Sequence, residues 1–490
     1  MMPPEQTTDV LIIGAGPAGT CAALRLLALG HKVALAESEP FPRPQIGESL
    51  SPGIRNIFDY LDATDLLTNR NYLHQLNAQV VWETTTPQTV SAAQRGPGVM
   101  VDRGQFDKDL LDLAVQRGLQ LYQPARFESC KQVDGRWQSQ LRQYTQLITV
   151  ESKFILDARG RRGNNMQDRV LTAPPTIAIW GHLPADVMPA DTLVEATEKG
   201  WIWGSPTPTR QFRVITFTDP RELKGNTVPG VFHHLLSGTR FFHKAADSWK
   251  INDLQTCTVF TYAHTFPWQD NYLRLGEAAF SLDPLSSTGV EKAMRFSLQA
   301  AIAVNTILKT GHKDMAQTFY EDRMIESICS HTHWTSAYYA QAWPGQQRAF
   351  WKERSVPFID QTPAPTAFYE RLSHKFTAPK EKGPERRINV QQELQRLWHE
   401  QIHLSSALIF KETPCVIDDV LQLRTAIQHP NLEREMAYLE TVEISPLLSV
   451  ANKEATFGAI VQEWSKVLPF EQAVRIAFFL WDKDILCTTA

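Results

Sequence analysis

The sequence predicts an α/β fold in which a Rossmann-type domain carries an inserted β-sheet and is followed by a small, mostly α-helical C-terminal domain. Three observations lead to this prediction. A glycine-rich turn joins a buried strand to a helix near the N-terminus, β-like runs fill residues 71–100 and 170–265, and helix-like patterns broken by prolines follow residue 388. Alternating strand and helix patterns are typical of a parallel sheet, and the added β-runs read as an insertion into it.

The composition favours an intracellular globular protein and gives no reason to expect a nucleic-acid partner or a membrane span. The chain has 490 residues, 43% of them hydrophobic, with a net charge of −4, so a sizeable core is expected and a nucleic-acid partner is not. Residues 1–9 carry no basic cluster followed by an apolar run, and no stretch is apolar enough for a membrane helix. Six scattered cysteines without a C-x-x-C pair indicate reduced thiols and a cytoplasmic setting.

The first segment has the fingerprint of a dinucleotide-binding unit. Residues 10–13 form a buried strand, and the glycines of Gly14-x-Gly16-x-x-Gly19 open the helix after it. Such glycines allow a tight turn and close approach of the backbone to a pyrophosphate at the helix N-terminus. Glu37 closes the next strand, 18 residues past Gly19, where a carboxylate accepts hydrogen bonds from an adenosine ribose. The alternative is an ordinary glycine-rich turn with a solvated glutamate.

A second segment favours FAD over NAD. Gly276-Glu277 and the run from Asp283 to Thr288-Gly289 come directly before a long helix predicted over residues 289–309. The N-terminus of that helix would lie against an electron-rich ring, where it stabilises the negative charge of a reduced flavin. Arg159, Arg161 and Arg162 follow a third strand at residues 155–160; they are either a solvated loop or a basic turn that meets NAD(P)H phosphate.

The domain boundaries follow from composition. Residues 1–356 hold the nucleotide-binding domain and its inserted sheet, at about 71–100 and 170–265. Between residues 357 and 387 the composition turns to Pro, Lys, Glu and Arg, which predicts a linker. Residues 388–490 are predicted to form the small helical domain.

These segments together resemble the FAD-dependent monooxygenase superfamily and, within it, the branch that contains the flavin-dependent halogenases. The resemblance spans about residues 8–355, and the segment from Phe41 to Pro52 is its most specific part. It implies a Rossmann-type FAD domain with a substrate-side sheet, an arginine at position 103 that contacts FAD, and a Thr288-Gly289 turn beside the flavin. The FAD-binding residues predicted from the pattern and the resemblance are Gly14, Gly16, Gly19, Glu37, Arg43, Glu48, Ser49, Arg103, Gly276, Glu277, Asp283, Thr288 and Gly289.

Residues 200–206 resemble the W-x-W-x-I-P signature of the halogenases. Trp201 and Trp203 match its tryptophans, but Ser205 stands where the signature has isoleucine. The resemblance implies that the two rings lie beside the tunnel between flavin and substrate. The alternative is two core tryptophans on one face of a strand, since residues i and i+2 point the same way.

One departure from the family bears directly on the reaction. The halogenases use a lysine, on a strand after the segment matching residues 47–49, to handle hypohalous acid, whereas this sequence has no lysine between Lys32 and Lys108. A neutral side chain has no ammonium group that could donate a hydrogen bond to hypohalous acid. His74 lies near the missing lysine and is a candidate base, with a structural or solvated histidine as the alternative. Glu277 replaces the usual aspartate, which predicts weaker retention of FAD.

The sequence therefore predicts a monooxygenase that hydroxylates an electron-rich aromatic ring through a flavin C4a-hydroperoxide, with NAD(P)H as electron source, directly or through a partner flavin reductase. Among halogenase-like proteins it resembles those that hydroxylate a tryptophan of a precursor polypeptide during tryptophylquinone biogenesis. The alternatives are a halogenase with an altered lysine site, a reductase of the geranylgeranyl type, and a partner-binding flavoprotein with little turnover. His331 and His333 face different directions on a predicted helix, so no metal site is expected.

Overall fold

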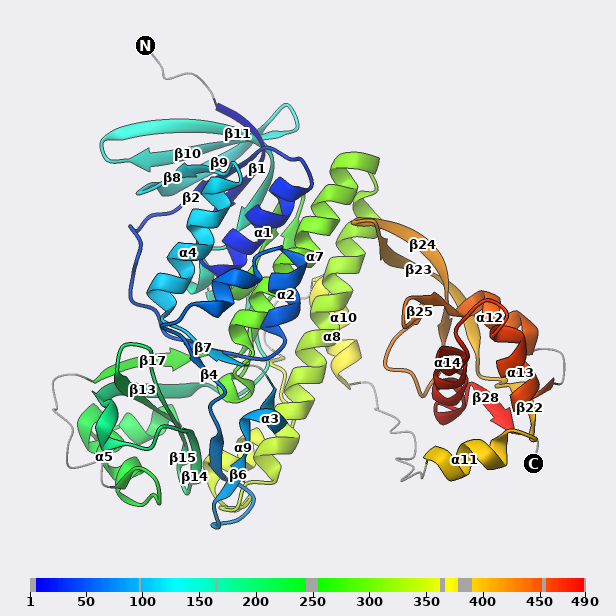
Figure 1. Ribbon diagram of the computed structural model, residues 1–490. Helices are drawn as coiled ribbons and strands as arrows, with labels where there is room; N and C mark the ends of the chain where they lie inside the picture. The colour runs from blue at the N-terminus through cyan, green and yellow to red at the C-terminus, as the bar shows by residue number, and fades with distance from the viewer. Residues whose placement is uncertain are drawn as a thin grey trace. The chain divides into compact units, whose positions relative to one another are not determined.

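The chain forms two compact units, residues 1–376 and 377–490, in the computed structural model shown in Figure 1. The structure describes residues 6–96, 98–163, 166–243, 254–361, 366–377, 390–451 and 455–488. The mixed α/β class with an inserted sheet is confirmed.

The first unit is built on an eight-stranded sheet whose central strands are parallel. Its order is β19-β20-β11-β1-β2-β8, and β9 and β10 extend it from β11 as antiparallel strands. The last four residues of β1, Val10 to Ile13, are all apolar and buried, as expected for a strand covered on both faces. The strands are β1 (Gln6–Ile13), β2 (Val33–Ala36), β8 (Gln120–Tyr122), β9 (Arg126–Val133), β10 (Arg136–Gln143), β11 (Gln146–Asp157), β19 (Trp268–Gln269) and β20 (Tyr272–Arg274).

Four helices carry the frame of this unit. They are α1 (Pro17–Ala28), α4 (Arg103–Gln116), α7 (Gly289–Thr310) and α8 (Lys313–Ala340). The predicted long helix is confirmed as α7, which packs closely against α1 and α8 (Figure 1). α1 begins shortly after β1, and α7 begins after a short turn at Pro284–Ser286. The two N-termini supply two sets of unpaired backbone N–H groups to the same domain.

The inserted sheet is seven-stranded, in the order β17-β13-β16-β15-β14-β5-β6. One face packs on α5 (Val228–Ser237), with Ile202 and Phe212 at its centre. The other face, called here the site face, packs on residues of α8 and of α9 (Ala349–Arg354). The strands are β5 (Ala78–Val81), β6 (Gln88–Val90), β13 (Thr176–Pro184), β14 (Thr192–Thr197), β15 (Gly200–Pro206), β16 (Gln211–Thr218) and β17 (Gln255–Val259).

Short elements complete the first unit. One three-stranded sheet joins β3 to β7 and β4, and another joins β12 to β18 and β21. A helix, α10, occupies Ala367–Thr377, so part of the predicted linker is helical; residues 378–389 lie outside the described residues. The elements are α2 (Ile54–Tyr60), α3 (Ala92–Arg95), β3 (Ser49–Leu50), β4 (Leu73–His74), β7 (Val99–Met100), β12 (Arg169–Leu171), β18 (Tyr262–His264) and β21 (Phe280–Ser281).

The second unit contains the predicted helices together with strands that were not predicted. Its helices are α11 (Val390–Leu397), α12 (Ile444–Ala451), α13 (Phe457–Trp464) and α14 (Phe470–Asp482). Its strands are β22 (Gln401–Leu404), β23 (Ile409–Ile417), β24 (Val420–Gln428), β25 (Tyr438–Leu439), β26 (Val442–Glu443), β27 (Ala455–Thr456) and β28 (Leu486–Thr488). Pro414, read from the sequence as a helix breaker, lies within β23 of a two-stranded hairpin, where an edge strand tolerates a proline.

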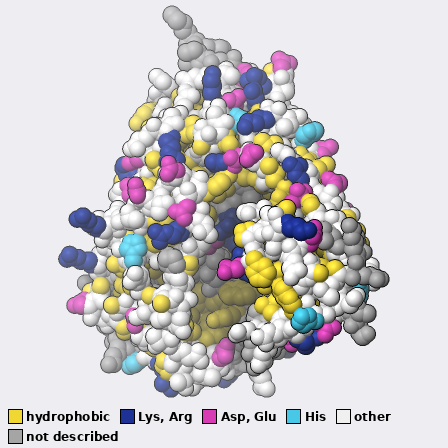
Figure 2. Space-filling view, turned by 45° about the vertical axis from the view of Figure 1, so that its right-hand side comes forward, with side chains coloured by type: hydrophobic (Ala, Val, Ile, Leu, Met, Phe, Trp, Pro, Cys, Tyr) yellow, Lys and Arg dark blue, Asp and Glu magenta, His cyan; other side chains and the backbone are white. Residues whose placement is uncertain are grey.

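Charges and cysteines agree with the composition. On the face shown in Figure 2, acidic and basic side chains are interspersed rather than gathered by sign. All six cysteines are thiols rather than disulfides. Within the described part of the chain, no helix combines the length and the apolar character that crossing a membrane requires.

The core of the second unit depends on Trp464. Its side chain is 1% exposed and its Nε1 donates to the Leu447 carbonyl at 3.0 Å. Truncating a buried tryptophan to alanine costs about 3–5 kcal/mol. We therefore expect Trp464→Ala to lower the free energy of unfolding of this unit by that amount in denaturant titrations followed by circular dichroism. The matched control Val467→Ala, whose parent side chain is 76% exposed, should change it by less than about 0.5 kcal/mol; equal effects would contradict this packing.

Candidate functional site

The turn between β1 and α1 leaves the N-terminus of α1 open. Gly14 has a φ of 105°, and a Cβ there would lie 2.5 Å from the Ala158 carbonyl oxygen. A Cβ on Gly19 would lie 2.0 Å from the Gly14 carbonyl oxygen. At Gly16 a Cβ would meet no heavy atom within 4 Å. The outer two glycines thus serve close packing, whereas the space at Gly16 suits a pyrophosphate group, and the residues present fit a dinucleotide.

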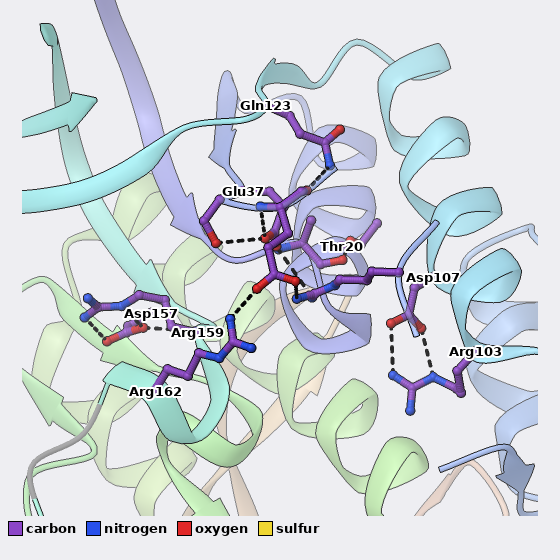
Figure 3. A network of polar contacts seen from close by, with 12 residues as sticks. Thr20, Glu37, Arg103, Asp107, Gln123, Asp157, Arg159 and Arg162 are labelled. Atoms are coloured by element: carbon purple, nitrogen blue, oxygen red, sulfur yellow. Dashed lines mark hydrogen bonds and ion pairs between the residues drawn. The ribbon is translucent and has the colours of Figure 1, made fainter. Parts of the chain in front are cut away.

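Glu37 directly follows β2, beside this turn. Its Oε2 accepts from the Ala15 backbone N–H at 2.8 Å, its Oε1 accepts from the Glu39 N–H at 2.9 Å, and the side chain is 4% exposed (Figure 3). Arg43 approaches Oε2 at 3.6 Å. The Ser38 hydroxyl also donates to Oε1, at 3.3 Å. A carboxylate has about four acceptor positions, so Glu37 keeps about one of them for a ribose hydroxyl group.

A basic rim surrounds that corner. Arg162 forms an ion pair with Glu39 that lowers the pKa of its carboxyl group, and the Arg159 guanidinium pairs with Asp157 at 2.7 Å (Figure 3). Both arginines are therefore engaged with carboxylates, which favours the structural interpretation of this turn over a free phosphate site.

Arg103 holds the loop of residues 46–48. Its guanidinium is 6% exposed, pairs with Asp107 at 2.9 Å and donates to the Ile46 carbonyl at 2.8 Å (Figure 3). Gly47 has a φ of 98°, and a Cβ there would lie 2.9 Å from Arg103 Nη1 and 3.8 Å from a methyl group of Val290. Arg103 therefore fixes this loop beside the first turn of α7.

Glu48 connects the same loop to the inserted sheet. Its Oε1 lies 2.7 Å from Arg213 Nη2 on β16, and its Oε2 accepts from the Gly47 N–H at 3.0 Å. Burial raises the pKa of Glu48, and the charge of Arg213 opposes that shift. Ser49 follows in β3, where it pairs with Met100.

Gly276 and Glu277 lie before α7. Gly276 has a φ of 53°, and a Cβ there would lie 3.0 Å from that of Ala18 on α1. The Glu277 carboxylate pairs with Arg161 at 2.9 Å, and its backbone carbonyl accepts from the Tyr262 hydroxyl. The longer acidic side chain is thus directed to an arginine.

Asp283 organises the turn that starts α7. Its carboxylate caps Leu285 N–H at 3.0 Å and accepts from the Tyr339 hydroxyl, which lies 3.1 and 3.2 Å from its two oxygens. His331 Nε2 lies 3.2 Å from the Asp283 carbonyl oxygen. Burial raises the pKa of Asp283, against the hydrogen bonds from Leu285 and Tyr339 and the charge of Arg354. Thr288 then precedes Gly289, the first residue of α7.

Aromatic rings line the site face above this turn. Trp201 and Trp203 both lie on that face of β15, and Trp201 stacks on Phe217 with centroids 4.0 Å apart. Trp82 lies edge-on to Trp201 at 6.3 Å, and Tyr339 packs in the same cluster. Trp201 is 3% exposed and is a core ring, whereas Trp203 is partly buried. The position of the pair beside a tunnel between flavin and substrate stays a prediction.

β5 lies in the stretch where the resemblance places the lysine of the halogenases, and it presents no ammonium on the site face. Val80 and Trp82 pack into the aromatic cluster, whereas Gln79 points to the opposite face and donates to Asp191 at 2.6 Å. Lys292, in the first turn of α7, is half-buried, and burial lowers its pKa.

His74 stands apart from these groups. It ends β4, as expected for a strand end, and its side chain is exposed across β7 from Leu50. Its role as a base stays a prediction. The sequence did not predict the contact of Tyr339 with Asp283 or that of Arg213 with Glu48. These side chains reach the site from a long helix and from mid-sheet, and no local motif marks either contact.

Three comparisons relate the chain to known proteins. Residues 7–225 match the family described as FAD binding domain. A tryptophan 2-halogenase of Chondromyces crocatus is 27% identical over 343 residues, which cover 64% of each chain and thus just under two thirds of that halogenase. Among solved structures, the flavin-dependent halogenase CmlS matches with a TM-score of 0.74 and 21% identity over 99% of this chain and 96% of CmlS.

Another solved structure is similar over both units. QhpG, a peptidyl tryptophan dihydroxylase essential for tryptophylquinone cofactor biogenesis, matches with a TM-score of 0.71 and 18% identity over 97% of this chain and 99% of QhpG. At this identity the likeness establishes the shared fold. The chain thus matches the FAD binding domain family over residues 7–225 and is similar to a tryptophan 2-halogenase over 64% of its length.

Proposed function

We propose that this protein is an FAD-dependent monooxygenase that uses O2 to hydroxylate an electron-rich aromatic ring, an indole, carried by a precursor polypeptide. The observation that carries the proposal is the composition of the site face: tryptophan, tyrosine and phenylalanine rings, with apolar residues on the strand where a halogenase has its lysine. The similarity to a tryptophan halogenase and to a peptidyl tryptophan dihydroxylase supports the substrate class.

The residues assigned to FAD follow the two helix N-termini. The α1 turn at Gly14, Gly16 and Gly19 would take the pyrophosphate, and Glu37 the adenosine ribose. Arg103, Glu48 and Ser49 would shape the loop beside the ring, and the turn from Asp283 to Gly289 would lie at its other side. When bound and reduced, FAD supplies the electrons that activate O2. An NAD(P)H-dependent step, direct or through a flavin reductase, would supply those electrons.

The protein's own contribution is orientation and control of protons and water. The aromatic cluster excludes water from the ring-binding region. The buried Asp283 carboxylate, held by Tyr339, is the group placed to hold a proton at the start of α7. It is a positioning residue for that turn and a proton holder rather than a nucleophile.

The direct test is product mass spectrometry. We would supply the enzyme with reduced FAD, ¹⁸O2 and chloride, and offer free indoles and tryptophan-bearing polypeptides. The expected product carries one or two labelled oxygen atoms and forms on the polypeptide. Product formed only on free small molecules would contradict the polypeptide assignment, and no oxygen transfer to any ring would contradict the monooxygenase.

A halogenase is the second candidate, because the relatives include halogenases and because Lys292 offers a half-buried ammonium near the start of α7. The same experiment separates the two functions. A chlorine isotope doublet without labelled oxygen would establish halogenation and would direct attention to Lys292→Met, which should then abolish it.

The Glu37 assignment predicts a selective loss of FAD affinity. A hydrogen bond to a charged group is worth about 1.5–3 kcal/mol, so Glu37→Gln should weaken FAD binding about tenfold or more in fluorescence titrations. Glu39→Gln is the matched control, since that carboxylate lies two residues on and is 38% exposed. Its Kd for FAD should stay within about threefold of wild type. Equal losses in both variants would place the ribose elsewhere.

The Asp283–Tyr339 pair predicts a shift in the pH profile. The Tyr339 hydrogen bond lowers the pKa of Asp283, so Tyr339→Phe should raise it. If hydroxylation needs the ionised carboxylate, activity is lost as pH falls through that pKa, and the acidic limb of kcat should move to higher pH.

Asp283→Asn should remove this limb, and Tyr338→Phe, altered one residue away, should leave it in place. The groups facing Asp283 are Tyr339, His331 and Arg354. Burial lowers the pKa of His331 to about 4, so a limb that disappears in His331→Gln instead would assign it to the histidine.

A further inference from the structure

Arg213 is a buried arginine with two unused donors. It lies on β16, is 8% exposed, and pairs with Glu48 through Nη2 alone. Its Nε and Nη1 are buried and meet no acceptor among the described residues. Leaving a buried N–H group without an acceptor costs free energy, more so for a charged group. Such a side chain is suited to an acceptor that a ligand brings.

Its neighbours make a polar end to the site face. The sheet register places Arg213 opposite Ser205 on one side and His182 on the other. Ser205 is the residue that departs from the halogenase signature, and its hydroxyl lies 3.2 Å from that of Thr192. The polar departure in the sequence therefore falls beside the arginine with unused donors.

The charges at this end already balance. Glu48 compensates Arg213, and Asp107 compensates Arg103. Burial and the charge of Arg213 lower the pKa of His182 to about 4, so this histidine is neutral at neutral pH. A carboxylate ligand would add an uncompensated negative charge next to Glu48, at a cost in a buried site. An uncharged carbonyl oxygen would take the two donors without that cost.

The polar end is close to the aromatic cluster. Ile215 lies two residues further along β16, on the same face, opposite Trp203. A strand rises about 3.3 Å per residue, so the two backbone positions are about 7 Å apart. The bonds between an indole ring and the carbonyl group of its own residue can bridge such a separation.

We propose that Arg213, assisted by Ser205, forms a subsite that binds the backbone carbonyl oxygen of a tryptophan within a polypeptide while its indole ring lies against the aromatic part of the site face. This subsite deepens the proposed function and rests on its substrate class. It would make the enzyme select a peptide-linked indole over a free indole or a free carboxylate.

The test is equilibrium binding to the FAD-loaded full-length enzyme, followed by calorimetry and by the flavin absorbance. The probes are N-acetyltryptophan amide, N-acetyltryptophan, which ends in a carboxylate, and indole. Wild type should bind the amide more tightly than either other probe. Arg213→Lys keeps the charge for Glu48 but loses the planar fork of donors. It should weaken binding of the amide at least tenfold, leave indole within twofold, and leave the FAD spectrum unchanged.

Two further variants are needed, one as a control and one as an independent test of the subsite. Arg210→Gln changes an exposed arginine three residues away and should leave all three affinities unchanged. Ser205→Ala should weaken binding of the amide alone, by a smaller factor than Arg213→Lys, and it tests the subsite if Arg213→Lys does not fold.

Several results would overturn the subsite. These are wild type that does not bind the amide, wild type that prefers the carboxylate, and an Arg213→Lys variant that loses indole or FAD to the same extent as the amide. Because binding is measured without turnover, failure of hydroxylation is distinguishable: an Arg213-dependent preference for the amide without labelled oxygen in the product would refute the monooxygenase and retain the subsite.

Discussion

The geometry of the first unit depends on the loop of residues 46–48, which two buried arginines hold from opposite sides. Arg103, on α4, binds the Ile46 carbonyl, and Arg213, in the inserted sheet, pairs with Glu48. Each arginine also faces a carboxylate, so neither charge is buried alone. Breaking a buried pair by removing one partner is far more costly than its net worth. The loop therefore fixes how the nucleotide-binding sheet and the inserted sheet meet within this unit.

At the N-terminus of α7, a buried carboxylate is again held by a side chain from a distant segment, here the neutral Tyr339 rather than an arginine. Asp283 caps the short turn before the helix and accepts from Tyr339, a residue 56 positions later in the chain. The carboxylate thereby connects α7 and α8 to the site face, because Tyr339 also packs in the aromatic cluster. A change in the protonation of Asp283 would alter its hydrogen bond with Tyr339, and through it the packing of Tyr339 on the site face.

Local patterns allowed much of the fold to be predicted. Features that depend on residues close together in the sequence could be predicted. These are the glycine turn, the position of Glu37, the strand before Arg159 and the helix from Gly289. Contacts between distant segments could not be predicted, because only tertiary packing brings Tyr339 to Asp283 and Arg213 to Glu48. The strands of the second unit were missed because Pro414 was interpreted as a helix breaker, whereas an edge strand accommodates it.

The register of β5 shows what the absence of a lysine between Lys32 and Lys108 means for the site face. A single-residue alternation decides which side chains reach the site face, and here Val80 and Trp82 reach it while Gln79 does not. An ammonium at that strand would have to displace apolar packing and would be buried without a carboxylate partner among the residues described there. The side chains that β5 and Trp82 present to the site face therefore offer apolar contacts and no charged group. Among the described residues, this face becomes polar at the end that holds Ser205, Arg213 and His182, where the proposed subsite would take a ligand's backbone rather than its ring.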